Sequence, residues 1–278
     1  MWSVKGKARK EMRLHGDYCY DTDIGNKRKV NEDCARIVNN SHGDVLLVVC
    51  DGMGGHKRGD EASAVAIDLM FKAFKKKEGF LFASSARKWL EKTIRDVNEA
   101  VYNLESEKPF SEHMGTTLVA ALITRNYLIF ANVGDSRGYT LRLLDKDIVY
   151  DFEQITTDDT IADYLINTGR IKKEEREKYT SRHVLTNAIG LFPSVRMEIK
   201  MIPLIEKKVN VQKKKDSYYL NSVLLCSDGL FSMLSDDEIL HILTLNEEVE
   251  NKVEALISMA KNNGGDDNIA IALWEASN

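Results

Sequence analysis

One apolar run constrains the fold of this chain more than any other part of its sequence. The run Val45–Cys50 is rich in valine and leucine and contains no polar residue, which is typical of a strand buried on both faces. It ends in Asp51 and a glycine-rich turn over residues 52–59, where the backbone can come close to whatever the carboxylate holds. A carboxylate at the end of a buried strand is desolvated, so it needs a cation, hydrogen bonds or a proton. The alternative interpretation is a tight turn in which Asp51 caps the following helix.

Strand and helix patterns follow one another in an order that predicts an α+β fold. Strand patterns occur at residues 17–22, 34–38, 45–50, 116–123, 127–133, 139–143, 194–202, 218–226 and 269–274. Helical spacing of apolar residues marks an early pair of segments, 62–77 and 85–104, and a late pair that begins at Ser235 and Glu248. Ser235 and Glu238 also match a capping box. We therefore expect a four-layer α-β-β-α sandwich, in which two central, mostly antiparallel sheets are flanked by helix pairs.

The chain reads as a single domain with one terminal arm and one long insertion. It has 278 residues with only three prolines and no Gly/Ser-rich linker, which favours one domain over residues 16–278. Residues 1–15 carry five lysines and arginines against one glutamate, which predicts a flexible, solvated basic arm, with docking to a partner as the alternative. Residues 153–193 lack a strand signal and contain two short helical patterns. A connection of this length inside a compact domain is usually functional.

Composition excludes several classes of protein. The formal net charge of −4 argues against a general role at nucleic acids or membrane surfaces. No apolar run approaches the ~20 residues of a membrane span, and the N-terminus lacks the apolar core of a signal peptide, which together indicate the cytoplasm. The four cysteines, Cys19, Cys34, Cys50 and Cys226, have no paired spacing, so zinc and a disulfide framework are not expected.

Acidic residues recur where apolar strands begin or end. They are Glu32, Asp33, Asp51, Asp135, Asp228 and Asp267. If they converge, two carboxylates ~4 Å apart repel by about 4 kcal/mol at an effective dielectric constant near 20, so such a cluster must take up protons or divalent cations. A set of oxygen ligands without histidine or cysteine favours magnesium or manganese. Because such ions lower the pKa of a bound water to roughly 7, no nucleophilic side chain is required.

Arg28 lies four residues before Glu32, in a loop that contains Gly25. Its guanidinium could hold two phosphate oxygens in a bidentate contact close to the proposed cations. The alternative is an ordinary surface ion pair.

Six motifs in order resemble the metal-dependent serine/threonine protein phosphatases of the 2C type, the bacterial branch in particular. They are Gly25-x-x-Arg28-x-x-Asn31-Glu32-Asp33, Asp51-Gly52-Met53-Gly54-Gly55, Gly115-Thr116-Thr117, Gly134-Asp135-Ser136-Arg137, Cys226-Ser227-Asp228-Gly229-Leu230 and Gly265-Asp266-Asp267-Asn268-Ile269. The resemblance covers about residues 17–275. It implies a β-sandwich flanked by helices and a single phosphatase domain, with a mobile flap at about residues 153–180 beside the site.

The resemblance also implies a binuclear manganese or magnesium centre. Asp51 would bridge both cations, and Gly52 would offer its carbonyl oxygen to one of them. Asp228 and Asp267 would hold the other. The implied reaction is hydrolysis of phosphoserine or phosphothreonine by a metal-bridging hydroxide. The implied partners are phosphorylated proteins and a cognate serine/threonine kinase, in a signalling role. We expect a monomer.

Four further residues take roles from the same resemblance. Glu32 and Asp33 match the pair that supports the second cation, directly or through water. Asp135 matches a ligand of a third, weaker cation that it shares with Asp228. Arg28 matches the phosphate-binding arginine.

The chain departs from the family pattern at the flap. The family's Asp-His-Ser motif is replaced here by Asp158-Asp159-Thr160, so a histidine that assists turnover in some relatives is absent. Met53 stands where eukaryotic relatives often carry a histidine general acid, and nearby His56 is interpreted as structural. The identity of the general acid that protonates the leaving group therefore stays open.

Two other functions remain as alternatives. One is a catalytically inactive family member that acts as a binding or regulatory module, although every metal-site position is filled. The other is a different two-metal hydrolase, such as a nuclease or phosphodiesterase, against which the acidic net charge argues.

Overall fold

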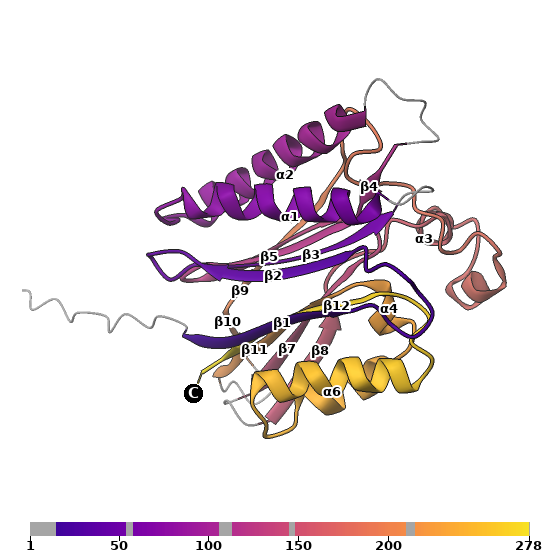
Figure 1. Cartoon of the computed structure of the whole chain (residues 1–278). Coiled ribbons are helices and arrows are strands. Elements are labelled where there is room, and N and C mark those ends of the chain that lie inside the picture. The colour runs from indigo at the N-terminus through magenta and orange to yellow at the C-terminus, as the bar shows by residue number, and fades with distance from the viewer. Residues whose placement is uncertain (1–14, 54–57, 106–112, 145–147, 210–214, 278) are drawn as a thin grey trace, which may run out of the picture.

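The computed structural model describes residues 15–53, 58–105, 113–144, 148–209 and 215–277. Within them, two six-stranded sheets lie face to face, and helices cover both outer faces (Figure 1). Every strand pairing in these sheets is antiparallel. The predicted four-layer α+β sandwich is therefore confirmed. The proposed basic arm, apart from its last residue, lies outside the described residues.

The first sheet has the strand order β1-β12-β11-β7-β8, with β10 paired to β11. Its strands are β1 (Gly16–Asp23), β7 (Arg137–Leu144), β8 (Ile148–Gln154), β10 (Ile205–Val209), β11 (Lys215–Cys226) and β12 (Ile269–Ala276). The second sheet has the order β2-β3-β5-β6-β9, with β4 paired to β3. Its strands are β2 (Asp33–Asn39), β3 (Val45–Met53), β4 (Gly115–Thr116), β5 (Leu118–Ile123), β6 (Tyr127–Val133) and β9 (Glu198–Pro203).

Helices on each side cover one sheet. The helices α1 (Gly59–Lys75) and α2 (Ala83–Glu105) lie on the second sheet, and α4 (Asp228–Phe231), α5 (Asp236–Leu243) and α6 (Val249–Asn262) lie on the first. The helix α3 (Ile161–Asn167) and the 3₁₀ helix η2 (Lys173–Lys178) project beside one end of the sandwich (Figure 1). The predicted capping box is present, because Ser235 and Glu238 exchange hydrogen bonds at the start of α5.

Three apolar layers hold the sandwich together, and the run Val45–Cys50 serves two of them. Leu46 and Val48 pack against α1 and α2, whereas Leu47 and Val49 pack between the sheets. The side chains of all four are fully buried. Because successive strand residues face opposite sides, an uninterrupted apolar strand must be covered on both faces. The prediction from this run is confirmed.

Two strands were not expected from the sequence. The strand β8 lies at a sheet edge, where Ile148 is 62% exposed, so its apolar pattern is weak. The strand β10 falls in a lysine-rich segment between two predicted strand patterns, residues 194–202 and 218–226. Both strands form because β7 and the first residues of β11, which do not pair with β12, offer a free edge. This information comes from outside the two segments themselves. Among the described helices, none is both long enough and apolar enough to cross a bilayer.

Candidate active site

The predicted acidic residues meet at one end of the sandwich, although they come from distant parts of the chain. Glu32 directly precedes β2 and Asp33 begins it. Asp51 and Gly52 lie near the end of β3, Asp135 between β6 and β7, Asp228 at the start of α4, and Asp267 just before β12. Asp33 and Asp51 are direct partners in the β2–β3 ladder. The strand ends of both sheets therefore bring these carboxylates to one place.

Ser227 joins the two sheets at the centre of this cluster. Its hydroxyl donates to Asp33 Oδ2 at 2.5 Å and accepts from the backbone N–H of Ala270 at 2.8 Å. Ser227 follows β11 in the first sheet, whereas Asp33 belongs to the second. The fully buried hydroxyl of Ser227 thus links the carboxylate of Asp33 in one sheet to the backbone of the other sheet.

Asp51 is held by its backbone, which leaves its carboxylate for other partners. Its N–H donates to Thr117 Oγ1 at 2.9 Å, and its C=O accepts from Thr117 N at 2.8 Å and Thr116 Oγ1 at 2.9 Å. The following turn requires glycine, because a Cβ atom on Gly52 would lie 2.2 Å from the carbonyl oxygen of Gly59. The close approach of these two backbones places the Gly52 carbonyl beside the acidic cluster.

The acidic side chains raise one another's pKa values. Burial is the largest cause, and it places the pKa of Asp51 well above its ordinary value, with the charges of Asp33 and Asp228 adding to the shift. Burial and the charges of Asp228 and Asp267 also raise the pKa of Asp33. Burial, followed by the charge of Asp228, raises the pKa of Asp135 to about 7. Such a cluster is stable as ions only when positive charge lies within it.

Arg28 supplies part of that charge. Its Nη2 atom lies 2.6 Å from Asp267 Oδ2, and its side chain is half exposed. Asn268 secures the loop around it by donating to the carbonyls of Ile24 and Val30, both at 3.0 Å, and by accepting from Glu32 N at 2.9 Å. The ion pair that was the alternative for Arg28 therefore exists, and its partner is one of the proposed cation ligands.

The donor set fits hard divalent cations. Burial raises the pKa values of both Asp33 and Asp228, and each of these side chains also shares a hydrogen bond with the Asp51 carboxyl group, so Asp51 contacts both of them. Among the described residues, no three acidic, histidine or cysteine side chains are already arranged as a coordination sphere. Buried oxygen donors that repel one another are nevertheless the chemistry that magnesium and manganese ions satisfy.

Three supporting residues were not assigned roles from the sequence, although each lies within a quoted motif. They are Thr117, Ser227 and Asn268. Each holds a site residue through hydrogen bonds to a segment far away in the chain, with sequence separations from 66 to 244 residues. The only local signal was their adjacency to an acidic or glycine-rich motif. His56, interpreted as structural, lies outside the described residues.

Comparison with known proteins decides the family. A family profile described as Protein phosphatase 2C matches residues 25–273. The serine/threonine phosphatase stp of Listeria innocua is 36% identical over 263 residues, which is 94% of this chain and 96% of the relative. The chain belongs to the protein phosphatase 2C family. The resemblance stated from the six motifs, and the expectation of an enzyme of the protein-serine/threonine phosphatase class, are confirmed.

Solved structures agree with this membership in phosphatase 2C. The serine/threonine phosphatase Stp1 of Staphylococcus aureus has a TM-score of 0.82 and 30% identity, and the match covers 99% of this chain and 100% of that one. The catalytic domain of the phosphatase PstP, solved in complex with two manganese ions, has a TM-score of 0.73 and 30% identity, and the match covers 95% of this chain and 99% of that one.

Replacing Ser227 by alanine tests the hydrogen bonds through which its hydroxyl links the two sheets. We expect Ser227→Ala to lower the free energy of unfolding by about 2 kcal/mol, because it leaves the buried Ala270 N–H without an acceptor and Asp33 without a donor. Urea denaturation measures this loss, and manganese-dependent thermal stabilisation should weaken as well. Ser222→Ala is the matched control, since this buried serine lies on β11, the strand that ends just before Ser227, and bonds Glu275 instead. It should cost stability without changing the response to manganese, and an equal effect of both variants on that response would rule out a special role for Ser227.

Proposed function

We propose that this chain hydrolyses phosphoserine and phosphothreonine side chains of proteins with the help of divalent cations bound at the acidic cluster. One observation carries the proposal: Asp51 pairs with Asp33 in the β2–β3 ladder and contacts Asp228 from a distant segment, and Arg28 bonds Asp267 of the same cluster. Structural carboxylates are seldom buried together in this way, because each burial costs free energy that only cations or protons offset. The manganese ions named for the related PstP domain support the same assignment.

The cations would be held by residues that the sequence predicted. Asp51 and the Gly52 carbonyl would share one cation, Asp228 and Asp267 the other, and Asp51 would bridge the two. Bound magnesium or manganese supplies an activated water at neutral pH and neutralises charge on the phosphoryl oxygens. Glu32 and Asp33 would support this pair, and Asp135 would bind a third, weaker cation together with Asp228.

The chain's own residues orient the substrate and the ligands. The planar guanidinium of Arg28, half exposed at the rim of the cluster, is suited to two phosphate oxygens at once. Thr117 fixes the backbone of Asp51, and Ser227 fixes the carboxylate of Asp33. Since Asp33 and Asp135 are buried while Arg28 is half exposed, a phosphorylated side chain would enter past the arginine.

The direct test is release of inorganic phosphate from phosphoserine and phosphothreonine peptides. We expect turnover with manganese or magnesium and none after treatment with EDTA. Failure to release phosphate at saturating manganese, while phosphopeptides still bind, would instead favour the inactive binding module. Turnover that is indifferent to EDTA would exclude the cation mechanism.

Arg28 has a neighbour that provides a matched control. Lys27 pairs with Asp266 as Arg28 pairs with Asp267, and its side chain is 65% exposed. We expect Arg28→Ala to raise the KM for a phosphopeptide about tenfold with a smaller change in kcat, because it removes a charge-assisted contact to phosphate. Lys27→Ala should leave both constants within about twofold. Equal KM values for the two variants would remove Arg28 from phosphate binding.

Phosphorylated proteins are the proposed substrates. A cognate kinase, a monomeric state and a cytoplasmic location stay predictions from the sequence.

A further inference from the structure

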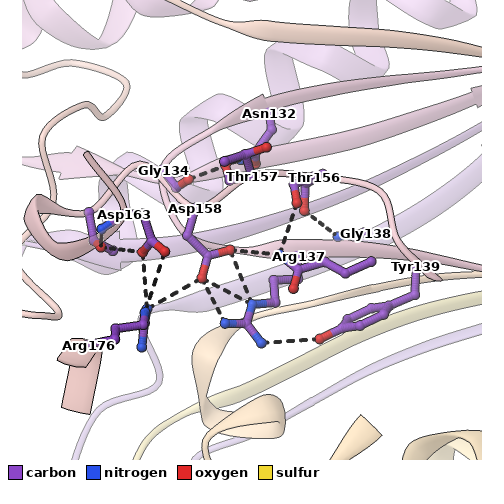
Figure 2. A network of polar contacts seen from close by, with 12 residues as sticks. Asn132, Gly134, Arg137, Gly138, Tyr139, Thr156, Thr157, Asp158, Asp163 and Arg176 are labelled. Atoms are coloured by element: carbon purple, nitrogen blue, oxygen red, sulfur yellow. Dashed lines mark hydrogen bonds and ion pairs between the residues drawn. The ribbon is translucent and has the colours of Figure 1, made fainter. Parts of the chain in front are cut away.

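The first residues of the expected flap lie along the turn that carries Asp135. Each residue of the segment 155–159 forms a hydrogen bond with one of residues 132–138, and Figure 2 shows several of these bonds. The N–H of Ile155 donates to Gly138 O at 2.7 Å, and Thr156 Oγ1 accepts from Gly138 N at 3.0 Å. This part of the chain is therefore attached to the body of the protein, whereas α3 and η2 project from it.

Two consecutive acidic residues, Asp158 and Asp159, form hydrogen bonds with the turn on either side of Asp135. The N–H of Asp159 donates to Gly134 O at 3.0 Å, and its Oδ2 accepts from Gly134 N at 3.2 Å. Asp158 accepts from Arg137 Nη2 at 2.8 Å and from Arg137 Nε at 3.1 Å (Figure 2). We call these four residues, Gly134, Arg137, Asp158 and Asp159, the turn clamp.

Further contacts link the turn clamp to other parts of the fold. The carboxylate of Asp159 also accepts from Asn187 Nδ2 at 2.7 Å, and the Asp158 side chain is only 4% exposed. The guanidinium of Arg137 lies 3.7 Å from the centre of the Phe231 ring in α4, the helix that begins with Asp228. The clamp thus connects the turn of Asp135 to the helix of Asp228.

We propose that Asp159 is a positioning residue for Asp135, acting through Gly134, and that Asp158 performs the same task through Arg137. Gly134 takes a φ of 102°, which L side chains rarely adopt, so the turn needs fixed partners to present the Asp135 carboxylate in one direction. Asp159 supplies both a donor and an acceptor to that single residue. The inference rests on the proposed function, since it assigns Asp159 to the weaker cation site that Asp135 would form.

The departure from the family motif fits this role. Position 159 is an aspartate where many relatives carry histidine, and a carboxylate can accept the Gly134 and Asn187 hydrogen bonds together. Asp159, which replaces the catalytic histidine of some relatives, therefore has a defined place in the support of Asp135.

A double-mutant cycle tests the proposal. Asp135→Asn, Asp159→Ala and the double variant are compared with the wild type in the manganese concentration that gives half-maximal phosphate release. The number of weakly bound manganese ions, measured by electron paramagnetic resonance of the free ion, is the second readout. We expect each single variant to raise the half-maximal concentration about tenfold, and the double variant to be no worse than Asp135→Asn, since Asp159 acts through Asp135. Losses that multiply in the double variant would overturn the proposal.

Conservative and control variants separate positioning from general destabilisation. Asp159→Asn keeps an oxygen acceptor for Gly134 N–H and should recover most of the manganese response that Asp159→Ala loses. Glu198→Gln is the control, because Glu198 accepts from Thr157 N at 2.8 Å in the same segment but outside the turn clamp. An equal manganese shift in Glu198→Gln and Asp159→Ala would overturn the assignment. If Asp159→Ala does not fold, Asp158→Asn replaces it in the same cycle, with the same non-additivity expected.

The two proposals fail separately. Manganese binding without phosphate release by the wild-type protein would refute the proposed function, and the binding cycle would still decide whether Asp159 positions Asp135. Manganese-dependent release with additive losses would refute only the positioning role.

Discussion

An Asp51→Asn variant is expected to release phosphate at least about a thousandfold more slowly than the wild type at saturating manganese. Asp51 is partly buried and contacts both Asp33, its partner in the β2–β3 ladder, and Asp228. An amide keeps the shape of the side chain but supplies one neutral oxygen in place of the anion that the proposed mechanism places between two cations. The loss should therefore appear in kcat, and added manganese should not restore it.

The same substitution should not harm the metal-free fold. The amide removes an ionisable group that burial and two neighbouring acids already disfavour, so the metal-free variant should melt at or above the temperature of the wild type. Manganese, which should raise the melting temperature of the wild type, should leave that of the variant nearly unchanged. Differential scanning calorimetry with and without manganese measures both effects.

Asp44→Asn is a matched control at the opposite end of β3. This buried aspartate accepts from Asn40 Nδ2 and Phe80 N, both at 3.1 Å, and has no part in the acidic cluster. It should cost some stability and leave turnover intact. Full activity of Asp51→Asn, or a lower metal-free melting temperature than that of Asp44→Asn, would show that the cluster is not a cation site.

Patterns within short segments of the sequence were enough to predict the layers of the fold and the acidic residues at the strand ends. The run Val45–Cys50 demanded cover on both faces, and the fold provides helices on one side and a sheet on the other. Ser235 and Glu238 marked a helix start that depends only on neighbours within four residues. The convergence of Asp51, Asp228 and Asp267 followed because strand ends were recognisable one at a time.

Contacts between distant segments could not be predicted in the same way. No pattern in the sequence indicates that Ser227 donates to Asp33 or that Asn268 secures the loop of Arg28. Ser227 and Asp33 are 194 residues apart, and Asn268 lies 236 to 244 residues from its partners. The strand β10 escaped prediction for a related reason, because its pairing with β11 outweighs its lysine-rich composition.

The expected flap shows most clearly what could not be predicted from the sequence. The absence of a strand signal after residue 153 suggested one continuous insertion, with Asp159 as a lost catalytic position. In the structure, Asp158 and Asp159 bond to the turn of Asp135, and the projecting part begins at α3. Sequence alone identified the unusual residue but not its partner, because the partner lies 25 residues earlier in another strand connection.

A Gly229→Ala variant is expected to disrupt the site almost as strongly as loss of Asp51, by a purely steric route. A Cβ atom on Gly229 would lie 1.9 Å from the carbonyl oxygen of Asn268, and backbone cannot move aside as a flexible side chain can. Gly229 follows Asp228, and Asn268 follows Asp267, so the clash would push apart the two segments that carry these proposed cation ligands. A displacement of about 1 Å can lower turnover about a hundredfold.

The stability of Gly229→Ala should fall as well, by about 3 kcal/mol, because the added methyl group overpacks a buried contact between α4 and the start of β12. Gly43→Ala provides the contrast, since a Cβ atom there meets nothing within 4 Å although its φ is 81°. That variant should lose about 1 kcal/mol from the left-handed backbone alone and keep its activity. Urea denaturation and phosphate release on both variants distinguish the two costs. If Gly229→Ala retained wild-type turnover, the close packing of these backbones would not be what sets the distance between Asp228 and Asp267.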